Sequence, residues 1–348
     1  MMAPHANRPF QMNSSLSHFR GAFLFSVLAV AGGWLVGGTQ GAITVTFLAV
    51  LETSLSFDNA VVNAGVLNGW NEVWRRRFLL WGILVAVFGM RIFFPLLIVG
   101  LAGAIGPVEV LDLAINRPDE YSRILISAHH QIAAFGGAFL MMVFLKFFVD
   151  RHKTEHWFRP VEQPLTRLGK LEAIEGAMTL ALILGSAHLL QEPERGEFIV
   201  AGVWGVVTYI LAKGLSAVLG GDEEGNGHGS QIISQGIGGF LYLELLDASF
   251  SFDGVIAAFA MTNNLLIIAL GLGAGAMFVR SFTLLLVERG TLNTYRYLEH
   301  GAFWAIGALA VIMLAGVKFH IPEAVTGLLG ALLIALSLGS SIRANRSL

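Results

Sequence analysis

The sequence of 348 residues contains no cysteine, which excludes disulfide bonds, thiolate metal sites and cysteine nucleophiles. Charged residues are scarce, at 13% of the chain, and proline occurs only nine times. The formal net charge of −2 provides no basic surface of the kind that attracts nucleic acid, so no nucleic-acid partner is expected.

Apolar residues take the place of the missing charges. They account for 55% of the chain, and the mean hydropathy is +0.68, so the lipid bilayer is the expected environment. A spanning helix needs about 20 mostly apolar residues, so this length allows roughly ten spans with short loops and no added soluble domain. Forty-one glycines agree with this prediction, because small residues let transmembrane helices approach closely. We therefore expect an all-α integral membrane protein.

The apolar runs predict the domain organisation. Residues 1–18 are polar and lack periodicity, and are predicted to form a disordered cytoplasmic leader ahead of a membrane domain at 19–348. Residues 29–31 resemble a signal-peptide cleavage site, but the apolar run continues to Val36, so the first span is expected to be retained. The ten spans are predicted at residues 19–38, 42–67, 78–101, 123–148, 172–190, 198–219, 236–261, 265–287, 299–317 and 322–341.

The distribution of basic residues predicts the orientation. Lys and Arg accumulate in the cytoplasmic loops of membrane proteins. With the N-terminus inside, sixteen of the twenty-two basic residues fall on the cytoplasmic side. Removing the fifth span, 172–190, would place Arg289, Arg296, Arg343 and Arg346 on the wrong side of the membrane. The pattern favours a multi-pass protein of the bacterial inner membrane with both termini in the cytoplasm.

An internal repeat is the most informative feature. Residues 52–59 read ETSLSFDN and residues 247–254 read DASFSFDG, so an acid, two serines, a phenylalanine and an aspartate recur in register. Each motif is followed one span later by an intramembrane arginine, Arg91 or Arg280. Equivalent spans are five apart, and an odd separation means that they cross the membrane in opposite directions, as in many secondary transporters. We expect two inverted repeats of five spans each, at residues 19–190 and 198–341.

Acidic residues inside the spans predict a cation site. Each acid at the centre of a span costs roughly 2.5–3.5 kcal/mol on insertion scales, so a bound cation, a proton or an arginine is needed to compensate. Arg91 and Arg280 are the expected counter-charges. Carboxylate, amide and hydroxyl oxygens suit hard ions such as Mn²⁺, Mg²⁺ or Ca²⁺. The alternative is a static ion-pair network that ties the helices together. The predicted ligands are Glu52, Ser56, Asp58, Asn59, Glu244, Asp247, Ser251 and Asp253.

The spacing within the motifs predicts a local break. At about 100° per residue, the first acid and the last aspartate of each motif point in different directions on a regular helix. We therefore expect the second and seventh spans to be interrupted near the Ser-Phe-Asp segment, where freed carbonyl groups can join the ligands. Regular helices that line two walls of one cavity are the alternative. On either view, Asp58 and Asp253 are expected to lie within reach of one ion.

Three further residues are candidates for an accessory role. His130 opens the fourth span near the outer surface, where a histidine can bind a metal, relay protons or simply lie at the interface. Glu172 and Glu175 begin the fifth span, where they can recruit cations or stabilise the helix N-terminus.

The motifs resemble those of the TerC family of bacterial membrane proteins, which includes manganese exporters and belongs to a wider grouping with lysine-exporter-like transporters. The family pattern Glu-x-x-x-Ser-x-Asp-Asn is matched by residues 52–59, and Asp-x-x-x-Ser-x-Asp-Ser is matched by 247–254 except at Gly254. The arginine-serine pair 280–281 and the segment 297–301 are also similar. The resemblance covers residues 42–315 and implies manganese efflux with these acids as ion ligands. Gly254 and the long loop 149–171 indicate a divergent branch.

These observations predict a secondary transporter that exports a divalent cation, with Mn²⁺ favoured, and not an enzyme. The cation is the transported substrate, and no prosthetic group is expected. One alternative is an intramembrane aspartyl protease with Asp58 and Asp253 as its dyad. The acid and serine repeated before each aspartate serve a cation site and have no role in such a dyad. Export of amino acids or other small solutes is the second alternative.

Overall fold

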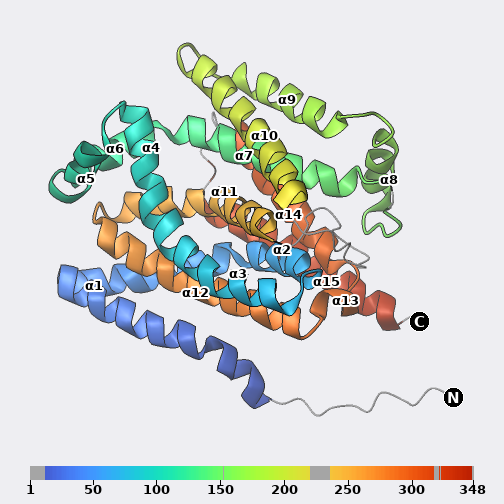
Figure 1. Ribbon diagram of the computed structural model, residues 1–348, viewed down its shortest axis with the longest axis horizontal. Coiled ribbons are helices and arrows are strands. Elements are labelled where there is room, and N and C mark those ends of the chain that lie inside the picture. Colours follow the sequence, from blue (N-terminus) through green and yellow to red (C-terminus); the bar gives the residue numbers. More distant parts are fainter. Residues whose placement is uncertain (1–11, 152, 220–235, 317–320, 322, 347–348) are drawn as a thin grey trace.

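The computed structural model describes residues 12–151, 153–219, 236–316, 321 and 323–346, and this part of the chain is all-helical (Figure 1). In chain order the elements are α1 (Met12–Leu55), α2 (Phe57–Asn68), α3 (Glu72–Leu84), the π-helix η1 (Val85–Phe93), α4 (Phe94–Gly103), α5 (Pro107–Asn116), α6 (Pro118–Ser127), α7 (His129–Phe148), α8 (Arg159–Leu168), α9 (Ile174–Ala187), α10 (Glu194–Leu219), α11 (Ile237–Met261), α12 (Leu265–Glu288), α13 (Thr291–Thr294), α14 (Leu298–Ala315) and α15 (Glu323–Arg346). Helix α1 begins at Met12, inside the predicted leader, and the rest of that leader lies outside the described residues.

Seven helices in the described part are long and apolar enough to cross a membrane, which agrees with a helical membrane protein. They are His18–Leu55, Glu72–Gly103, His129–Phe148, Glu194–Leu219, Leu265–Glu288, Leu298–Ala315 and Val325–Arg346.

The difference from the ten predicted spans has three local sources. Helix α1 is one of the seven, yet it covers the first predicted span and most of the second. Helix α9 has only 14 residues, which gives a length of about 21 Å at 1.5 Å per residue. Helix α11 has 25 residues, but the motif acids and Glu244 lower its apolar character.

Helix α1 reverses direction in its middle. Gly37 and Gly38 have non-helical backbone angles, with φ of +59° at Gly38, and Figure 1 shows the two arms of α1 lying side by side. The arms touch through glycine. A Cβ on Gly33 would lie 2.9 Å from the carbonyl oxygen of Gly41 and 2.6 Å from Val45, so neither arm has room for a larger residue here.

Helix α12 packs along α1 more extensively than any other pair of helices packs. Small residues of α12 allow this approach, because a Cβ on Gly271 would lie 2.6 Å from Leu48 and a Cβ on Gly275 would lie 2.6 Å from Glu52 Cγ. The close packing of α12 therefore places the first acid of the first motif against a helix that carries Arg280.

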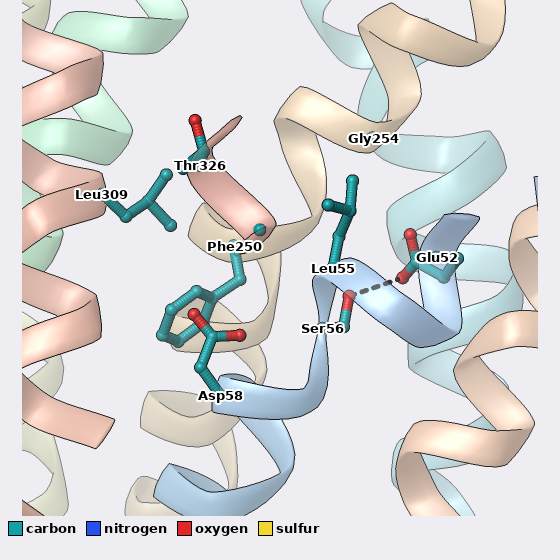
Figure 2. A pocket seen from close by; sticks show the side chains of 9 residues that line it. Glu52, Leu55, Ser56, Asp58, Phe250, Gly254, Leu309 and Thr326 are labelled. Carbon is teal, nitrogen blue, oxygen red and sulfur yellow. Dashed lines mark hydrogen bonds between the residues drawn. The ribbon is translucent and has the colours of Figure 1, made fainter. Parts of the chain in front are cut away.

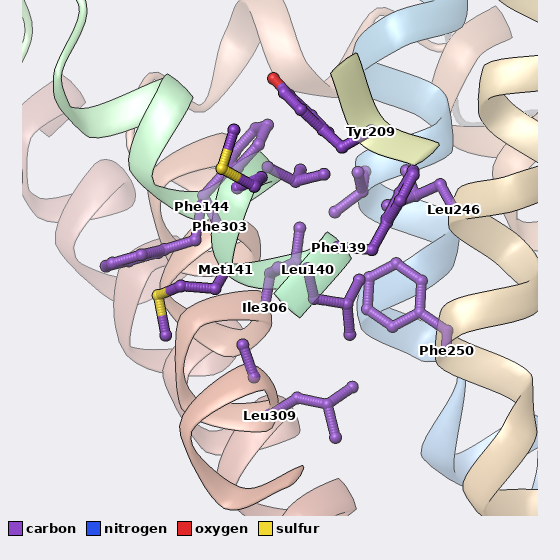
Figure 3. Close-up of a cluster of buried hydrophobic side chains, with 14 of the residues drawn as sticks. Phe139, Leu140, Met141, Phe144, Tyr209, Leu246, Phe250, Phe303, Ile306 and Leu309 are labelled. Atoms are coloured by element: carbon purple, nitrogen blue, oxygen red, sulfur yellow. The ribbon is translucent and has the colours of Figure 1, made fainter. Parts of the chain in front are cut away.

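The largest buried apolar cluster joins α7, α10, α11 and α14. Figure 3 shows Phe139 and Phe144 of α7 facing Tyr209, Phe250 and Phe303 from the neighbouring helices. Helix α7 is buried over most of its length, whereas α1, α10 and α15 expose many large apolar side chains. Such exposed apolar faces suit contact with lipid.

The two Ser-Phe-Asp segments differ in backbone. The second predicted span is interrupted at Ser56, between α1 and α2, so the predicted break is confirmed there. The amide of Asn59 donates to Asp58 Oδ1 at 2.8 Å, which supplies a partner for an N–H group in the first turn of α2. The predicted break in the seventh span is wrong, because α11 is helical throughout. There Ser249 Oγ donates to the Leu245 carbonyl four residues back, a bond compatible with a continuous helix.

Candidate cation-binding site

Four charged residues and one asparagine, each from a different element, meet at the junction of α1 and α2. Glu52 ends α1, Asn59 lies in the first turn of α2, Arg91 lies in η1, and Asp247 and Arg280 come from α11 and α12. All five side chains are buried, with Arg91 only 1% exposed. A π-helical segment such as η1 is uncommon and often marks a functional site.

Arg91 links the first acids of the two motifs. Its Nη2 donates to Glu52 Oε1, and its Nη1 lies 3.7 Å from Asp247 Oδ2. Asn59 adds a second connection between the motifs, because its Nδ2 donates to Asp247 Oδ1. One guanidinium and one amide therefore hold the two motifs together.

Arg280 forms a separate ion pair with Glu244. Arg280 Nη2 lies 3.1 Å from Glu244 Oε1, and the guanidinium carbon lies 4.0 Å from the centre of the Phe78 ring. Gly82 of α3 faces this pair, and a Cβ there would lie 2.6 Å from Glu244 Oε1. Glycine at position 82 thus leaves room for a buried ion pair between α11 and α12.

A cavity opens on the other side of the Ser56 break. Its empty volume is about 470 Å³, including its open side, and it is lined by Glu52, Ser56 and Asp58 together with apolar and small residues of α11, α14 and α15. Figure 2 shows Glu52 and Asp58 on opposite sides of Ser56, whose Oγ donates to Glu52 Oε1 at 3.3 Å. We call this space the Asp58 cavity. Within the described part of the chain, none of its lining residues is basic.

A second cavity lies beyond Glu52. It is lined by Glu52, Asn59, Asn63 and Asp247, and also by Arg91 and Arg280. We call it the Asp247 cavity. Glu52 lines both cavities. Among the described residues, the only charged side chains that line the Asp58 cavity are acidic, whereas both arginines line the Asp247 cavity.

The predicted ligands therefore divide into groups and do not form one coordination sphere. Within the described residues, no three His, Asp or Glu side chains converge as a complete metal site. Ser251 is buried on α11, and its Oγ has no hydrogen-bond partner in the described part. The side chain of Asp253 lies outside the described residues, so the expected approach of Asp58 and Asp253 stays a prediction.

The accessory candidates lie apart from these cavities. His130 stacks edge-on with His129 at 5.9 Å between ring centres, and neither cavity includes it. Glu175 pairs with Lys146 at 3.0 Å, and Glu172 is exposed just before α9. Glu175 is thus held by a lysine of α7, which agrees with a structural role for this acid.

Several residues of the site lie outside the two repeated motifs, which therefore did not indicate them. Asn63 lies one turn after Asn59 on α2 and lines the Asp247 cavity. The i, i+4 spacing of two asparagines in an apolar run was a usable signal. Gly82 and Gly275 had none, because a glycine matters here only through the helix that packs against it.

Glu162, in the loop region 149–171, is a buried acid that the motifs did not indicate. It is 0% exposed and accepts hydrogen bonds from the Trp157 and Phe158 amides and from Trp304 Nε1, each at 3.0 Å. His156 and His300 each approach it at 3.7 Å. Because its oxygens already have these donors, Glu162 fastens the loop region to α14 and is not part of the cation site.

Lys153 lies beside this anchor. Its Nζ sits 3.6 Å from the centre of the Phe147 ring and 4.0 Å from that of Phe148. Burial lowers the pKa of Lys153 to about 7, although the nearby Glu162, Glu299 and Asp150 favour the charged form. The loop region therefore contains an amine that changes charge close to neutral pH.

The fold and the site together define a helical protein with apolar helices long enough to cross a bilayer and with buried carboxylates and arginines between them. The chain belongs to the DUF475 family, described as a protein of unknown function, whose profile matches residues 57–348. The matched region includes Asp58, Asn59 and the whole second motif, whereas Glu52 and Ser56 precede it. No curated protein and no solved structure matches the chain.

Proposed function

We propose that this protein is a secondary transporter that exports a divalent metal cation, with Mn²⁺ favoured, across the bacterial inner membrane. The observation that carries the proposal is the Asp58 cavity. It presents the carboxylates of Asp58 and Glu52 and the hydroxyl of Ser56, and no basic residue is found among the described residues that line it.

The charge of this cavity distinguishes it from a static ion-pair network. A static network neutralises its acids, as Arg280 does for Glu244. Among the described residues no basic group lies within 4 Å of Asp58, whose carboxylate accepts a hydrogen bond from the backbone amide of Asn59. A buried carboxylate without a counter-charge is costly, and a cation removes that cost.

The donor atoms favour a hard divalent ion. Carboxylate and hydroxyl oxygens, completed by water or backbone carbonyls, match the ligands that Mn²⁺, Mg²⁺ and Ca²⁺ prefer. The described lining of the Asp58 cavity has no cysteine or methionine sulfur, the ligand that soft ions such as Cu⁺ prefer. The choice of Mn²⁺ and the outward direction rest on the resemblance to TerC proteins.

Reciprocal contacts support the inverted repeat. Asn59 at the eighth place of the first motif donates to Asp247 at the first place of the second. Gly254 at the eighth place of the second motif faces Glu52 at the first place of the first, where a Cβ would lie 3.0 Å from Oε2. Such exchange of roles is typical of a two-fold relation between like elements. We propose ten membrane crossings in two inverted sets of five on this basis.

Asp58→Asn tests the proposal directly. We expect uptake of Mn²⁺ into inverted vesicles, whose cytoplasmic face points outward, to fall by a factor of about ten or more, because the change removes a carboxylate that has no counter-charge among the described residues. The amount of protein in the membrane should not fall, since a neutral side chain is easier to insert.

Asp112→Asn is the matched control, because Asp112 is an exposed aspartate that pairs with Arg117 at 3.1 Å on α5. Equal flux in Asp58→Asn and the control would overturn the transport proposal. Loss of the Asp58→Asn protein from the membrane would favour the static network. Peptide cleavage without metal flux would favour the aspartyl protease.

A further inference from the structure

Glu52 lies between two cavities that differ in their charged groups. On one side it lines the Asp58 cavity, and on the other it lines the Asp247 cavity with Asn59, Asn63 and both arginines. Its Oε1 is held by Arg91 and Ser56, whereas the space beside Oε2 is limited by Gly254. Among the described lining residues, Glu52 is the one that the two cavities share.

The Asp247 cavity contains buried oxygen atoms without donors. Asn63 is only 2% exposed, and its Oδ1 has no hydrogen-bond partner in the described part of the chain. The same is true of Asn59 Oδ1 and of Asp247 Oδ2, although Asp247 Oδ2 lies 3.7 Å from Arg91. Buried acceptors are normally satisfied, so three of them around one cavity are placed to accept from water or to bind a cation.

We propose that the Asp247 cavity is a second site for the divalent cation, and that Glu52 hands the ion between this site and the Asp58 cavity. This inference rests on the proposed transport function. The ligands at the second site are the oxygens of Asp247, Asn59 and Asn63, with Glu52 shared by both sites.

The arginines make the second site the weaker of the two. Arg91 lies against both Glu52 and Asp247, and Arg280 also lines this cavity, whereas the described lining of the Asp58 cavity has two carboxylates and no base. A divalent ion is therefore attracted less strongly to the second site. Moderate affinity suits a transfer step, because an ion that binds too tightly does not leave.

Asp247 can take up the ion without losing a hydrogen bond to arginine. The 3.7 Å separation between Arg91 Nη1 and Asp247 Oδ2 exceeds hydrogen-bonding distance, so Arg91 remains bound to Glu52 while Asp247 Oδ2 turns to the cation. The amide of Asn59 keeps Asp247 in place through its other oxygen. The carboxylate of Asp247 is thus fixed by Asn59 before the ion binds.

Asn63→Leu tests the second site, because leucine has a similar size but lacks the oxygen ligand. Binding of Mn²⁺ to the purified full-length protein is measured together with flux in vesicles. We expect two classes of site in the unmodified protein, the second about tenfold weaker or more. In Asn63→Leu the weak class should disappear and flux should fall about tenfold, while the affinity of the tight class changes less than about threefold.

Ser249→Ala is the matched control. Ser249 is a buried hydroxyl of the second motif that bonds to the Leu245 carbonyl and lines neither cavity. Both classes of site and the flux should survive this change. If Asn63→Leu does not fold, Asn63→Asp replaces it, and the added carboxylate should tighten the weak class about tenfold.

The outcomes separate this inference from the proposed function. A single class of site in the unmodified protein, or unchanged flux in Asn63→Leu, overturns the second site and leaves transport intact. A weak class that Asn63→Asp leaves unchanged overturns it as well. Absence of any Mn²⁺ binding by the unmodified protein overturns both the second site and the proposed function.

Discussion

Arg280 and Glu244 form the most self-contained ion pair of the site. The pair is buried, joined at 3.1 Å, and covered by the Phe78 ring on one side and by Gly82 on the other. Guanidinium remains charged at any relevant pH, so Arg280 supplies a permanent positive charge at the edge of the Asp247 cavity. When no cation is present, this charge reduces the repulsion among the surrounding carboxylates.

Replacement of Arg280 by Gln should separate binding from transport. We expect equilibrium binding of Mn²⁺ to stay unchanged or become tighter, because a competing positive charge is removed. Net export should slow by about tenfold, since ion release would leave uncompensated acids in a medium of low dielectric. Titration of the purified protein and flux in vesicles check the two parts. A parallel fall of binding and flux would identify Arg280 as a purely structural partner.

At the scale of single elements, the hairpin within α1 depends on glycine. Gly41→Ala would bring a methyl group into the backbone of Gly33, 3.1 Å from its carbonyl carbon and closer still to its oxygen. We expect the two arms to separate and the free energy of unfolding to fall by about 1–3 kcal/mol, as for other overpacked sites. A thermal melt in detergent measures the change.

Gly214→Ala on α10 provides the comparison for this hairpin test, because nothing lies within 4 Å of a Cβ at that position. Alanine favours a helix over glycine by up to about 1 kcal/mol, so this variant should be neutral or more stable. Equal melting temperatures for the two variants would mean that the arms of α1 do not depend on their close approach.

The loop region 149–171 should respond to pH through Lys153. Its pKa is lowered to about 7 when the loop is docked, whereas in a released loop it returns to an ordinary value near 10.4. Between these values the released state binds the extra proton, so docking becomes more stable as the pH rises from about 7.5 to about 9.5.

Chymotrypsin cleavage at Trp157 and Phe158 measures the docking of this loop region. Cleavage relative to an unstructured reference peptide should slow toward pH 9.5. Lys153→Met should abolish this dependence, and Lys170→Met, which removes an exposed lysine of the same region, should retain it. If cleavage of the Lys153→Met protein also slowed toward pH 9.5, a group other than Lys153 would cause the pH dependence of docking.

For the molecule as a whole, the inverted repeat requires that α9 crosses the membrane despite its 14 residues. The chain has no cysteine, so single cysteines can be introduced without removing others. We expect Glu194→Cys to react with an impermeant maleimide from the periplasmic side, and Glu172→Cys to react only after permeabilisation. Val108→Cys, 83% exposed on α5, is the periplasmic reference.

Labelling of Glu172→Cys and Glu194→Cys from the same side would remove the fifth crossing. The two motifs would then lie in helices of the same orientation, and the inverted repeat would fail. Transport by the cation site would still be testable through Asp58.

Much of the architecture follows from local properties of the sequence. Helical class, the apolar runs, the buried acids and the two arginines depend on composition and on neighbours a few residues away, and these predictions agree with the described structure. The break at Ser56 was also predictable, because Ser, Asp and Asn side chains compete locally for backbone hydrogen bonds. The same reasoning failed for α11, where packing on α7 and α10 accompanies a continuous helix.

The pairing of charges was decided only by the tertiary structure. Arg91 pairs with Glu52 and lies near Asp247, and Arg280 pairs with Glu244. Asp58 lines the Asp58 cavity and has no basic partner among the described residues. These partners lie far apart in the sequence, and spacing along one helix says nothing about which neighbouring helix faces it. Asn63 and Gly275 acquire their roles in the same way, from the close approach of α11 and α12 to the junction of α1 and α2. Sequence alone therefore determined that buried acids and arginines are present, while the packing of distant helices determined which acids are neutralised and which face open space.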